Sequence, residues 1–109
     1  MINPLRGEVA LHVDGAARRM RLTLGALAVL EARLGVGGLI GLAERFEGGG
    51  VRGDDLIALL TAGLNGGLAE GGAEITESEV AEMCFDGGVM AAAEAAGALL
   101  AATFRGGGR

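Results

Sequence analysis

The chain has 109 residues, 22 of them glycine; 50% of its residues are hydrophobic, and its formal net charge is −5 at pH 7. This hydrophobic content and low charge exclude an intrinsically disordered chain, and the glycines lack the three-residue period of collagen. No apolar run reaches the roughly 20 residues that span a bilayer, and the N-terminus lacks the pattern of a signal peptide. We therefore expect one cytoplasmic domain over residues 1–105, with a flexible tail at residues 106–109.

The charges are divided unevenly along the chain. All nine positive charges are arginines: residues 1–53 hold seven of them against five acidic residues, and residues 54–109 hold two against nine. Because nucleic acids are bound mainly through cation–phosphate contacts, the acidic second half argues against a nucleic-acid partner. The one basic cluster, Arg18, Arg19 and Arg21, has no aromatic residue beside it on which a base could stack.

Residues 6–22 predict a β-hairpin. Hydrophobic and polar residues alternate with a period of two on both sides of Asp14-Gly15, a pair suited to the positive φ angles of a tight turn. One face is expected to be apolar and to contain Val9, Leu11, Val13, Met20 and Leu22. The other face is expected to be polar and solvated and to contain Glu8, His12, Arg19 and Arg21. Since an isolated hairpin is only marginally stable, the apolar face must pack on the rest of the chain.

Residues 23–105 predict four or five short helices with glycines at their ends. Thr23 is a suitable N-cap for the first helix, and Gly35 supplies its C-terminal stop. Four leucines at helical spacing form the stripe that we expect to be buried: Leu24, Leu27, Leu30 and Leu34. A second segment ends at Gly48-Gly49-Gly50 and presents one apolar face, with Leu39, Leu42, Ala43 and Phe46.

The later helices are predicted from their capping residues. Asp54 is expected to be the N-cap of a helix that ends before a flexible surface loop at residues 66–74. Thr76 and Glu79 stand at capping-box spacing, and their helix is expected to continue to Gly87-Gly88. The alanine-rich residues 89–104 predict a last helix. This order predicts an α+β fold, an N-terminal hairpin followed by a small bundle of four or five short helices.

The chain shows no residue spacing typical of a catalytic, cofactor or metal site. His12, the only histidine, is expected to be a solvated strand residue rather than a base. Cys84 is the only cysteine, and its apolar neighbours Met83 and Phe85 predict a buried, inert thiol. The acidic residues between 77 and 82 are explained by a solvated helix start. We therefore expect no enzyme activity, cofactor, metal or small-molecule substrate.

Several segments carry a resemblance to a known family. They are Asn3-Pro4-Leu5-Arg6-Gly7-Glu8-Val9-Ala10-Leu11, the turn Asp14-Gly15, Arg21-Leu22-Thr23-Leu24-Gly25-Ala26-Leu27-Ala28 and the helical residues 54–64. The chain resembles the gene transfer agent tail protein family, which groups with phage tail-assembly-chaperone-like proteins. Gene transfer agents are phage-like particles of alphaproteobacteria, and the resemblance implies a role in assembling the tape measure and the tail tube. It implies no catalytic residues.

Two functions follow from the resemblance. The first is a non-enzymatic tail-assembly chaperone that binds tape measure or tail tube proteins; the alternative is a structural tube or junction subunit of the particle. Because tail tube subunits are typically β-rich and this sequence predicts two strands, it favours the chaperone. The candidate partner-binding residues are flexible or aromatic apolar side chains: Met83, Phe85, Met90, Leu99 and Phe104. An exposed hairpin edge also allows a homo-oligomer.

Overall fold

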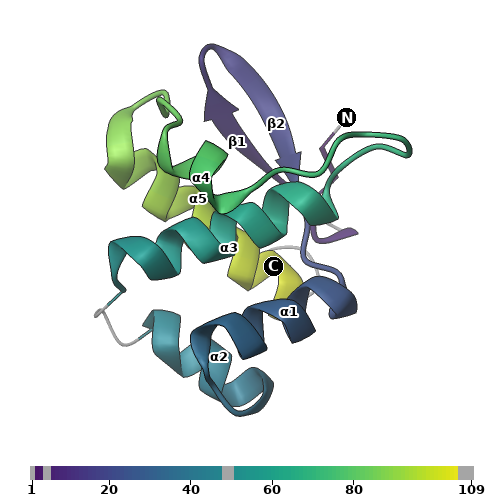
Figure 1. The fold of residues 1–109 in the computed structure, drawn as a ribbon, viewed down its shortest axis with the longest axis vertical. Helices are drawn as coiled ribbons and strands as arrows, with labels where there is room; N and C mark the ends of the chain where they lie inside the picture. Colours follow the sequence, from purple (N-terminus) through teal and green to yellow (C-terminus); the bar gives the residue numbers. More distant parts are fainter. Residues whose placement is uncertain (1, 4–5, 48–50, 106–109) are drawn as a thin grey trace.

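The computed structural model describes residues 2–3, 6–47 and 51–105. In these residues a two-stranded antiparallel sheet precedes five helices, which confirms the predicted α+β fold (Figure 1). The elements are β1 (Val9–Val13), β2 (Ala16–Met20), α1 (Leu24–Leu34), α2 (Gly38–Glu47), α3 (Gly53–Gly66), α4 (Glu77–Ala81) and α5 (Gly88–Arg105). The predicted tail at 106–109 and the predicted helix stop at 48–50 lie outside the described residues.

The hairpin has the predicted turn and register. Asp14 and Gly15 have φ angles of 52° and 78°, so both central residues of the turn have the positive φ of a type I′ hairpin. Val13 pairs with Ala16 and Val9 with Met20, which leaves a two-residue loop. The side chains of Leu11, Val13 and Met20 are buried, as the alternation predicts.

Glu8 departs from the predicted solvated face of the hairpin. Its side chain is buried, and its carboxylate accepts a hydrogen bond of 2.8 Å from the backbone N–H of Asn3. The backbone N–H of Glu8 in turn donates to the carbonyl of Asn3 at 3.2 Å. The prediction for Glu8 was wrong because Asn3 contacts this residue, which the strand alternation alone does not indicate.

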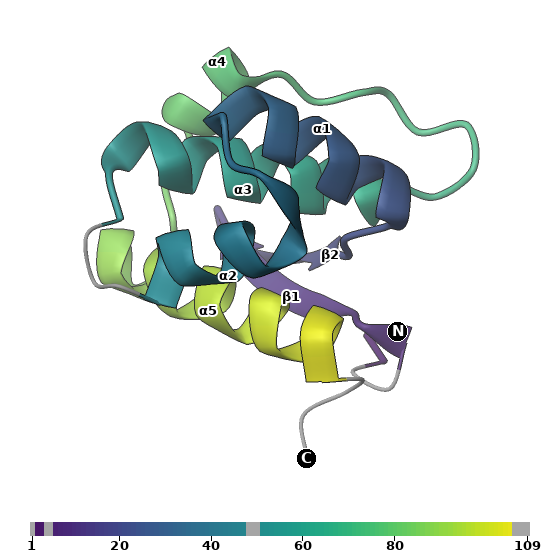
Figure 2. The same ribbon diagram turned by 90° about the horizontal axis from the view of Figure 1, so that it is seen from below.

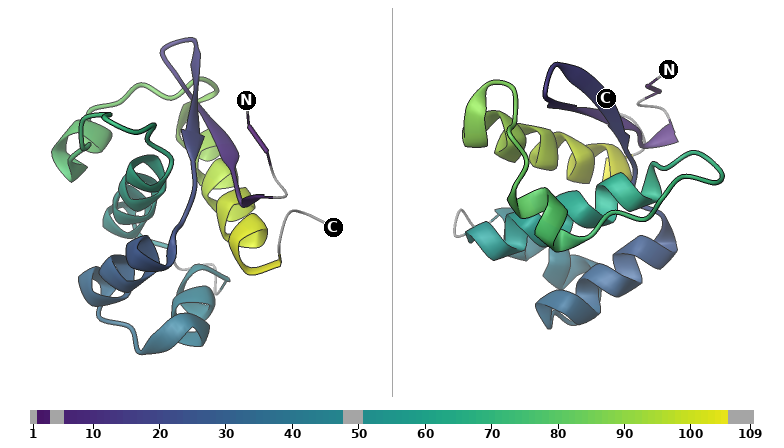
Figure 3. Two further views of the ribbon diagram at one scale, coloured as in Figure 1. Left: turned by 90° about the vertical axis from the view of Figure 1, so that its right-hand side faces the viewer. Right: turned by 45° about the horizontal axis from the view of Figure 1, so that its top comes forward.

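Helix α3 lies at the centre of the molecule. It packs against α1, β2, α4 and α5, while α5 packs against β1 (Figure 3). The hairpin therefore lies between α3 and α5, and both helices cover its apolar side. Small residues permit close approach at this point, because a side chain on Gly67 would clash with the backbone carbonyl of Arg19. The largest buried side chains are Leu11, Met20, Leu30, Leu42, Leu59, Leu60, Leu64, Leu99 and Val80.

The first helix confirms its predicted caps but not its whole predicted stripe. The Thr23 hydroxyl accepts a hydrogen bond of 3.0 Å from the Ala26 N–H, and Gly35 ends the helix in the left-handed region. Leu27, Leu30 and Leu34 are buried, whereas Leu24 is 78% exposed. Leu24 has helical spacing but is the first residue of α1, and the rest of the described chain leaves its side chain uncovered.

The start of α3 also differs from the prediction. Arg52 is the N-cap, and Asp54 lies inside the first turn of the helix. Its negative charge there still interacts favourably with the positive end of the helix dipole. Its neighbour Asp55 is buried and accepts a hydrogen bond of 3.4 Å from the Arg52 N–H. The cap position therefore lies two residues earlier than predicted.

The capping box of α4 is confirmed, but the helix is shorter than predicted. The Thr76 hydroxyl accepts from the Glu79 N–H at 3.2 Å, and the Glu79 carboxylate accepts from the Thr76 N–H at 2.8 Å. The helix ends at Ala81 instead of continuing to Gly87-Gly88. Phe85 forms an isolated antiparallel bridge with Val13, so this segment pairs with the outer edge of β1 instead of remaining helical.

Candidate functional site

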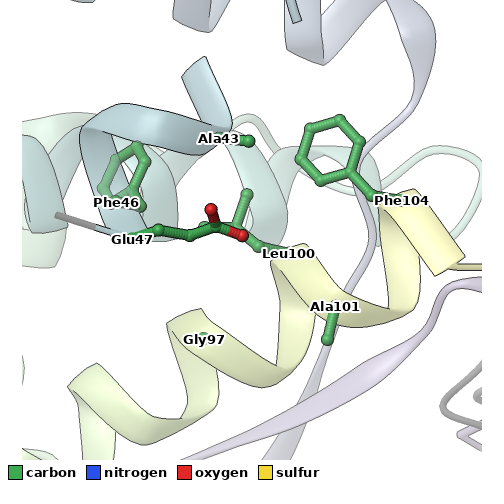
Figure 4. A pocket seen from close by; sticks show the side chains of 7 residues that line it. All are labelled: Ala43, Phe46, Glu47, Gly97, Leu100, Ala101 and Phe104. Carbon is green, nitrogen blue, oxygen red and sulfur yellow. The ribbon is translucent and has the colours of Figure 1, made fainter. Parts of the chain in front are cut away.

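An apolar groove lies between α2 and α5. Figure 4 shows Phe46 and Ala43 on α2 facing Leu100 and Phe104 on α5 across this space. The groove has a volume of about 200 Å³. We call it the α2–α5 groove; its lining residues are Ala43, Phe46, Glu47, Gly97, Leu100, Ala101 and Phe104.

The groove exists because α2 packs mainly against α1 and not closely against α5. Figure 2 shows α2 between the α1–α3 layer and α5, with its axis across the molecule. Gly97 adds to the space, because no atom lies within 4 Å of the position that a Cβ would take there. A second hollow of about 100 Å³ shares Phe46, Gly97 and Leu100 and extends the apolar surface toward the start of α3.

The chemistry of the groove suits another polypeptide better than a small molecule. Among the described residues that line it, Glu47 alone carries a charge. Its volume is below the roughly 300–1,000 Å³ typical of small-molecule sites. The rim is apolar and accessible, with Phe104 40% exposed, and Ile40 lies one turn before Ala43 with 78% of its surface exposed. Such a surface is typical of a protein contact, in which aromatic and aliphatic side chains are enriched.

An ion pair holds α2 beside α3. The Arg45 guanidinium donates from Nε to Oδ2 of Asp55 at 3.0 Å and from Nη2 to Oδ1 at 2.8 Å. A further N–H of Arg45 donates to the Leu34 carbonyl at the end of α1, at 3.3 Å. The hydrogen bonds from Arg45 lower the pKa of Asp55, although burial of the carboxyl opposes them. The sequence did not predict this pair, because nothing local relates the end of one helix to the third position of the next.

The structure separates the five candidate partner-binding residues. Phe104 lines the α2–α5 groove, and Met90 is 72% exposed near the start of α5. Met83 and Phe85 are half-buried and pack against the core. Leu99 is fully buried, so its side chain is not accessible to a partner in this fold. It lies on the face of α5 toward α3, whereas Leu100 faces the groove.

The two side chains considered for chemistry are both exposed. His12 is exposed on β1, which confirms its prediction as a solvated strand residue. Cys84 is also exposed, so the prediction of a buried thiol was wrong. The backbone of Cys84 is engaged, since its carbonyl accepts from the Asp14 N–H at 3.3 Å, and this bridge to the hairpin leaves the side chain outside the core. Within residues 2–3, 6–47 and 51–105, no group of three or more His, Cys, Asp or Glu side chains could hold a metal ion.

The fold and the groove define a small α+β protein with an apolar surface suited to contact with another polypeptide. A protein-family profile matches residues 6–106, and the family is described as phage tail tube protein, GTA-gp10, where GTA denotes a gene transfer agent. The chain therefore belongs to this family of gene transfer agent and phage tail proteins. Neither a search of curated proteins nor a search of solved structures gave a match.

No single helix among the described residues is both long and apolar enough to cross a bilayer. Helices α1 and α2 reach that length and hydropathy only as a pair, with a bend of 69° between them.

Proposed function

We propose that the chain is a non-enzymatic structural component of the tail of a gene transfer agent or related phage-like particle. The observation that carries this proposal is the family match over residues 6–106, because that family is described by its place in the tail tube. A structural role requires surfaces for neighbouring tail proteins rather than a catalytic centre. The chain would then be associated with the particle, during assembly and after it.

The α2–α5 groove is the surface that we propose for such a neighbour. Phe104, Leu100 and Phe46 would receive an apolar side chain from a tail tube or tape measure protein. Ile40 and Met90 have large exposed apolar side chains on the same two helices, and they would extend the contact. Burial of these side chains on assembly is favourable, because each removes apolar area from water.

A tail-assembly chaperone is the second candidate function. The observation in its favour is the small sheet: in the described residues the chain has two strands and five helices, whereas tail tube subunits are typically β-rich. A chaperone would use the same groove to bind the tape measure protein or a tube subunit before assembly. The chaperone would then dissociate, because other tail proteins cover the same surface of its partner in the finished tail.

The copy number of the chain in purified particles separates the two candidates. Quantitative mass spectrometry of particles and of the lysate that produces them measures the chain against a known tail protein. A structural component is expected in the particles at a constant ratio to the other tail proteins. Presence in the lysate with absence from the particles would contradict the structural proposal and support the chaperone.

A further inference from the structure

The outer edge of β2 is an open sheet edge near the hairpin turn. Hydrogen-bonded pairs alternate outward from a two-residue turn, so in this hairpin they are Val13–Ala16, Leu11–Arg18 and Val9–Met20. The backbone N–H and C=O groups of the odd-numbered residues of β2 therefore point away from β1. The next odd-numbered residue follows this rule, since the Arg21 N–H donates to the Gly63 carbonyl on α3 at 2.9 Å.

Only part of this edge is covered. Gly67 packs on the Arg19 carbonyl and accepts a hydrogen bond of 2.8 Å from the Arg19 side chain. No other part of the described chain forms a hydrogen bond with the outward backbone groups of Ala17. Beside Ala17 lies an open hollow of about 480 Å³, whose lining includes Arg18, Arg19, Gly67 and Leu68. An open strand edge beside a hollow is the geometry that accepts an added strand.

We propose that this edge pairs with the same edge of a second copy of the chain. The two β2 strands would run antiparallel about a two-fold axis at Ala17, so that each Ala17 exchanges two backbone hydrogen bonds with its counterpart. The two hairpins would then form one four-stranded sheet. Gly15, Ala16 and Ala17 are exposed and small, so two strands can approach here without a side-chain clash.

The charges favour this register. With Ala17 on the axis, Arg18 and Arg19 lie opposite Ala16 and Gly15 of the second copy, beside its hairpin turn. That turn is acidic, because it contains Asp14 and because the carboxylate of Asp86 accepts from the Gly15 N–H at 2.9 Å. Each basic strand end thus meets the other copy's acidic turn, whereas a register one residue further along would place Arg18 opposite Arg18.

The hollow supplies room for the second copy. It lies beside Arg19, at the level where the second copy's strand would end in its turn. The turn of the second copy would enter the hollow and contact its lining, which includes Gly67 and Leu68. Because both copies contribute the same strand and the same hollow, the contact closes on itself and predicts a dimer. The proposal does not depend on the tail role, so either can fail without the other.

A cysteine cross-link tests the register. Directly opposite residues in a hydrogen-bonded pair have Cα atoms about 5.5 Å apart, within the range of a disulfide. In a Cys84→Ser chain, Ala17→Cys is expected to form a disulfide-linked dimer under mild oxidation. The matched control Ala16→Cys lies diagonally from its counterpart, at about 7–8 Å or more, and is expected to cross-link far more slowly. Equal rates for the two variants would overturn the proposed register.

A proline tests the backbone contact. Ala17→Pro removes an N–H that the hairpin itself does not use, and proline is tolerated on such a strand edge. Ala17→Val keeps that N–H at the same position. Sedimentation velocity under reducing conditions is expected to show at least about tenfold weaker dimerisation for Ala17→Pro, from two lost hydrogen bonds, and little change for Ala17→Val. Far-UV circular dichroism and the unfolding midpoint verify that both variants are folded.

Two outcomes would overturn the proposal. One is a wild-type chain that stays monomeric up to about 100 µM, where a micromolar dissociation constant would be visible. The proposal is equally overturned if this monomeric chain binds a strand of a different tail protein at the β2 edge. The other is an Ala17→Pro variant that dimerises as strongly as the wild type.

Discussion

Arg45 and Asp55 form a two-point ion pair that joins three helices. Both carboxylate oxygens of Asp55 accept from the Arg45 guanidinium, at 3.0 and 2.8 Å, and Arg45 also donates to the last carbonyl of α1, on Leu34. The Asp55 side chain is 2% exposed, and that of Arg45 is 35% exposed. This pair fixes the position of α2, and α2 forms one wall of the α2–α5 groove. The stability of the groove therefore depends on the pair.

Replacing Asp55 is expected to destabilise the protein. Asp55→Asn keeps the size of the side chain but removes the charge that faces Arg45, and the expected cost in the free energy of unfolding is about 1–3 kcal/mol. Asp54→Asn is the matched control, because Asp54 is half-exposed and its pair with Arg52 is long, at 3.5 Å. It is expected to cost at most about 0.5 kcal/mol. Urea unfolding measures both values, and equal losses would contradict the special role of Asp55.

The same pair predicts a pH dependence of stability. Hydrogen bonds from Arg45 lower the pKa of Asp55 in the folded protein, so the unfolded chain binds more protons at this carboxyl. The resulting stabilisation is complete above the ordinary carboxyl pKa of about 4 and is lost as the pH falls through the lower folded pKa. Urea unfolding at a series of pH values from 6 down to 3 is expected to give a shallower pH dependence for Asp55→Asn than for the wild type. Parallel curves would contradict this assignment.

Substitution by alanine is expected to have opposite effects on stability at two glycines, Gly67 and Gly97. A Cβ on Gly67 would clash with the Arg19 carbonyl, and both sides of this contact are backbone, so Gly67→Ala is expected to destabilise by more than about 1 kcal/mol. A Cβ on Gly97 has no neighbour within 4 Å, and this residue is exposed inside α5. Gly97→Ala is expected to stabilise by about 0.5–1 kcal/mol, through helix propensity. Thermal unfolding of the two variants tests both signs.

The exposed thiol gives a rapid test of the segment before α5. Because Cys84 is exposed, it is expected to react with a thiol reagent such as dithionitrobenzoate in the folded protein at nearly the rate seen in denaturant. A protected thiol, reacting only upon unfolding, would show that residues 84–86 cover the side chain. The bridge between Phe85 and Val13 would then require a different local geometry.

Local hydrogen bonds account for what the sequence predicts well. The Thr23 cap and the Thr76–Glu79 capping box join residues three apart in the sequence. The spacing of these residue types is therefore enough to predict the hydrogen bonds. The Asp14-Gly15 turn is likewise determined by two φ angles. The hairpin and most of the helix starts could therefore be placed without knowledge of the tertiary fold.

Burial and long-range contacts could not be placed in this way. Leu24 and Leu99 are both apolar residues of amphipathic helices, yet Leu24 is 78% exposed and Leu99 is fully buried. Which of them is covered depends on where α3 lies. The α2–α5 groove likewise joins Ala43 and Phe46 to residues more than 50 positions later in the chain. Of its lining residues, only Phe104 was among the candidates chosen from the sequence.

Site-specific photo-cross-linking in purified particles tests the central claim most directly. A photoreactive amino acid at the position of Phe104 reports what lies in the α2–α5 groove, and the same amino acid at the exposed position of Glu82 serves as the control. We predict a cross-link from position 104 to another tail protein and little or none from position 82. Particles that contain the chain but give no cross-link at position 104, or equal cross-links at both positions, would contradict the groove as the contact surface.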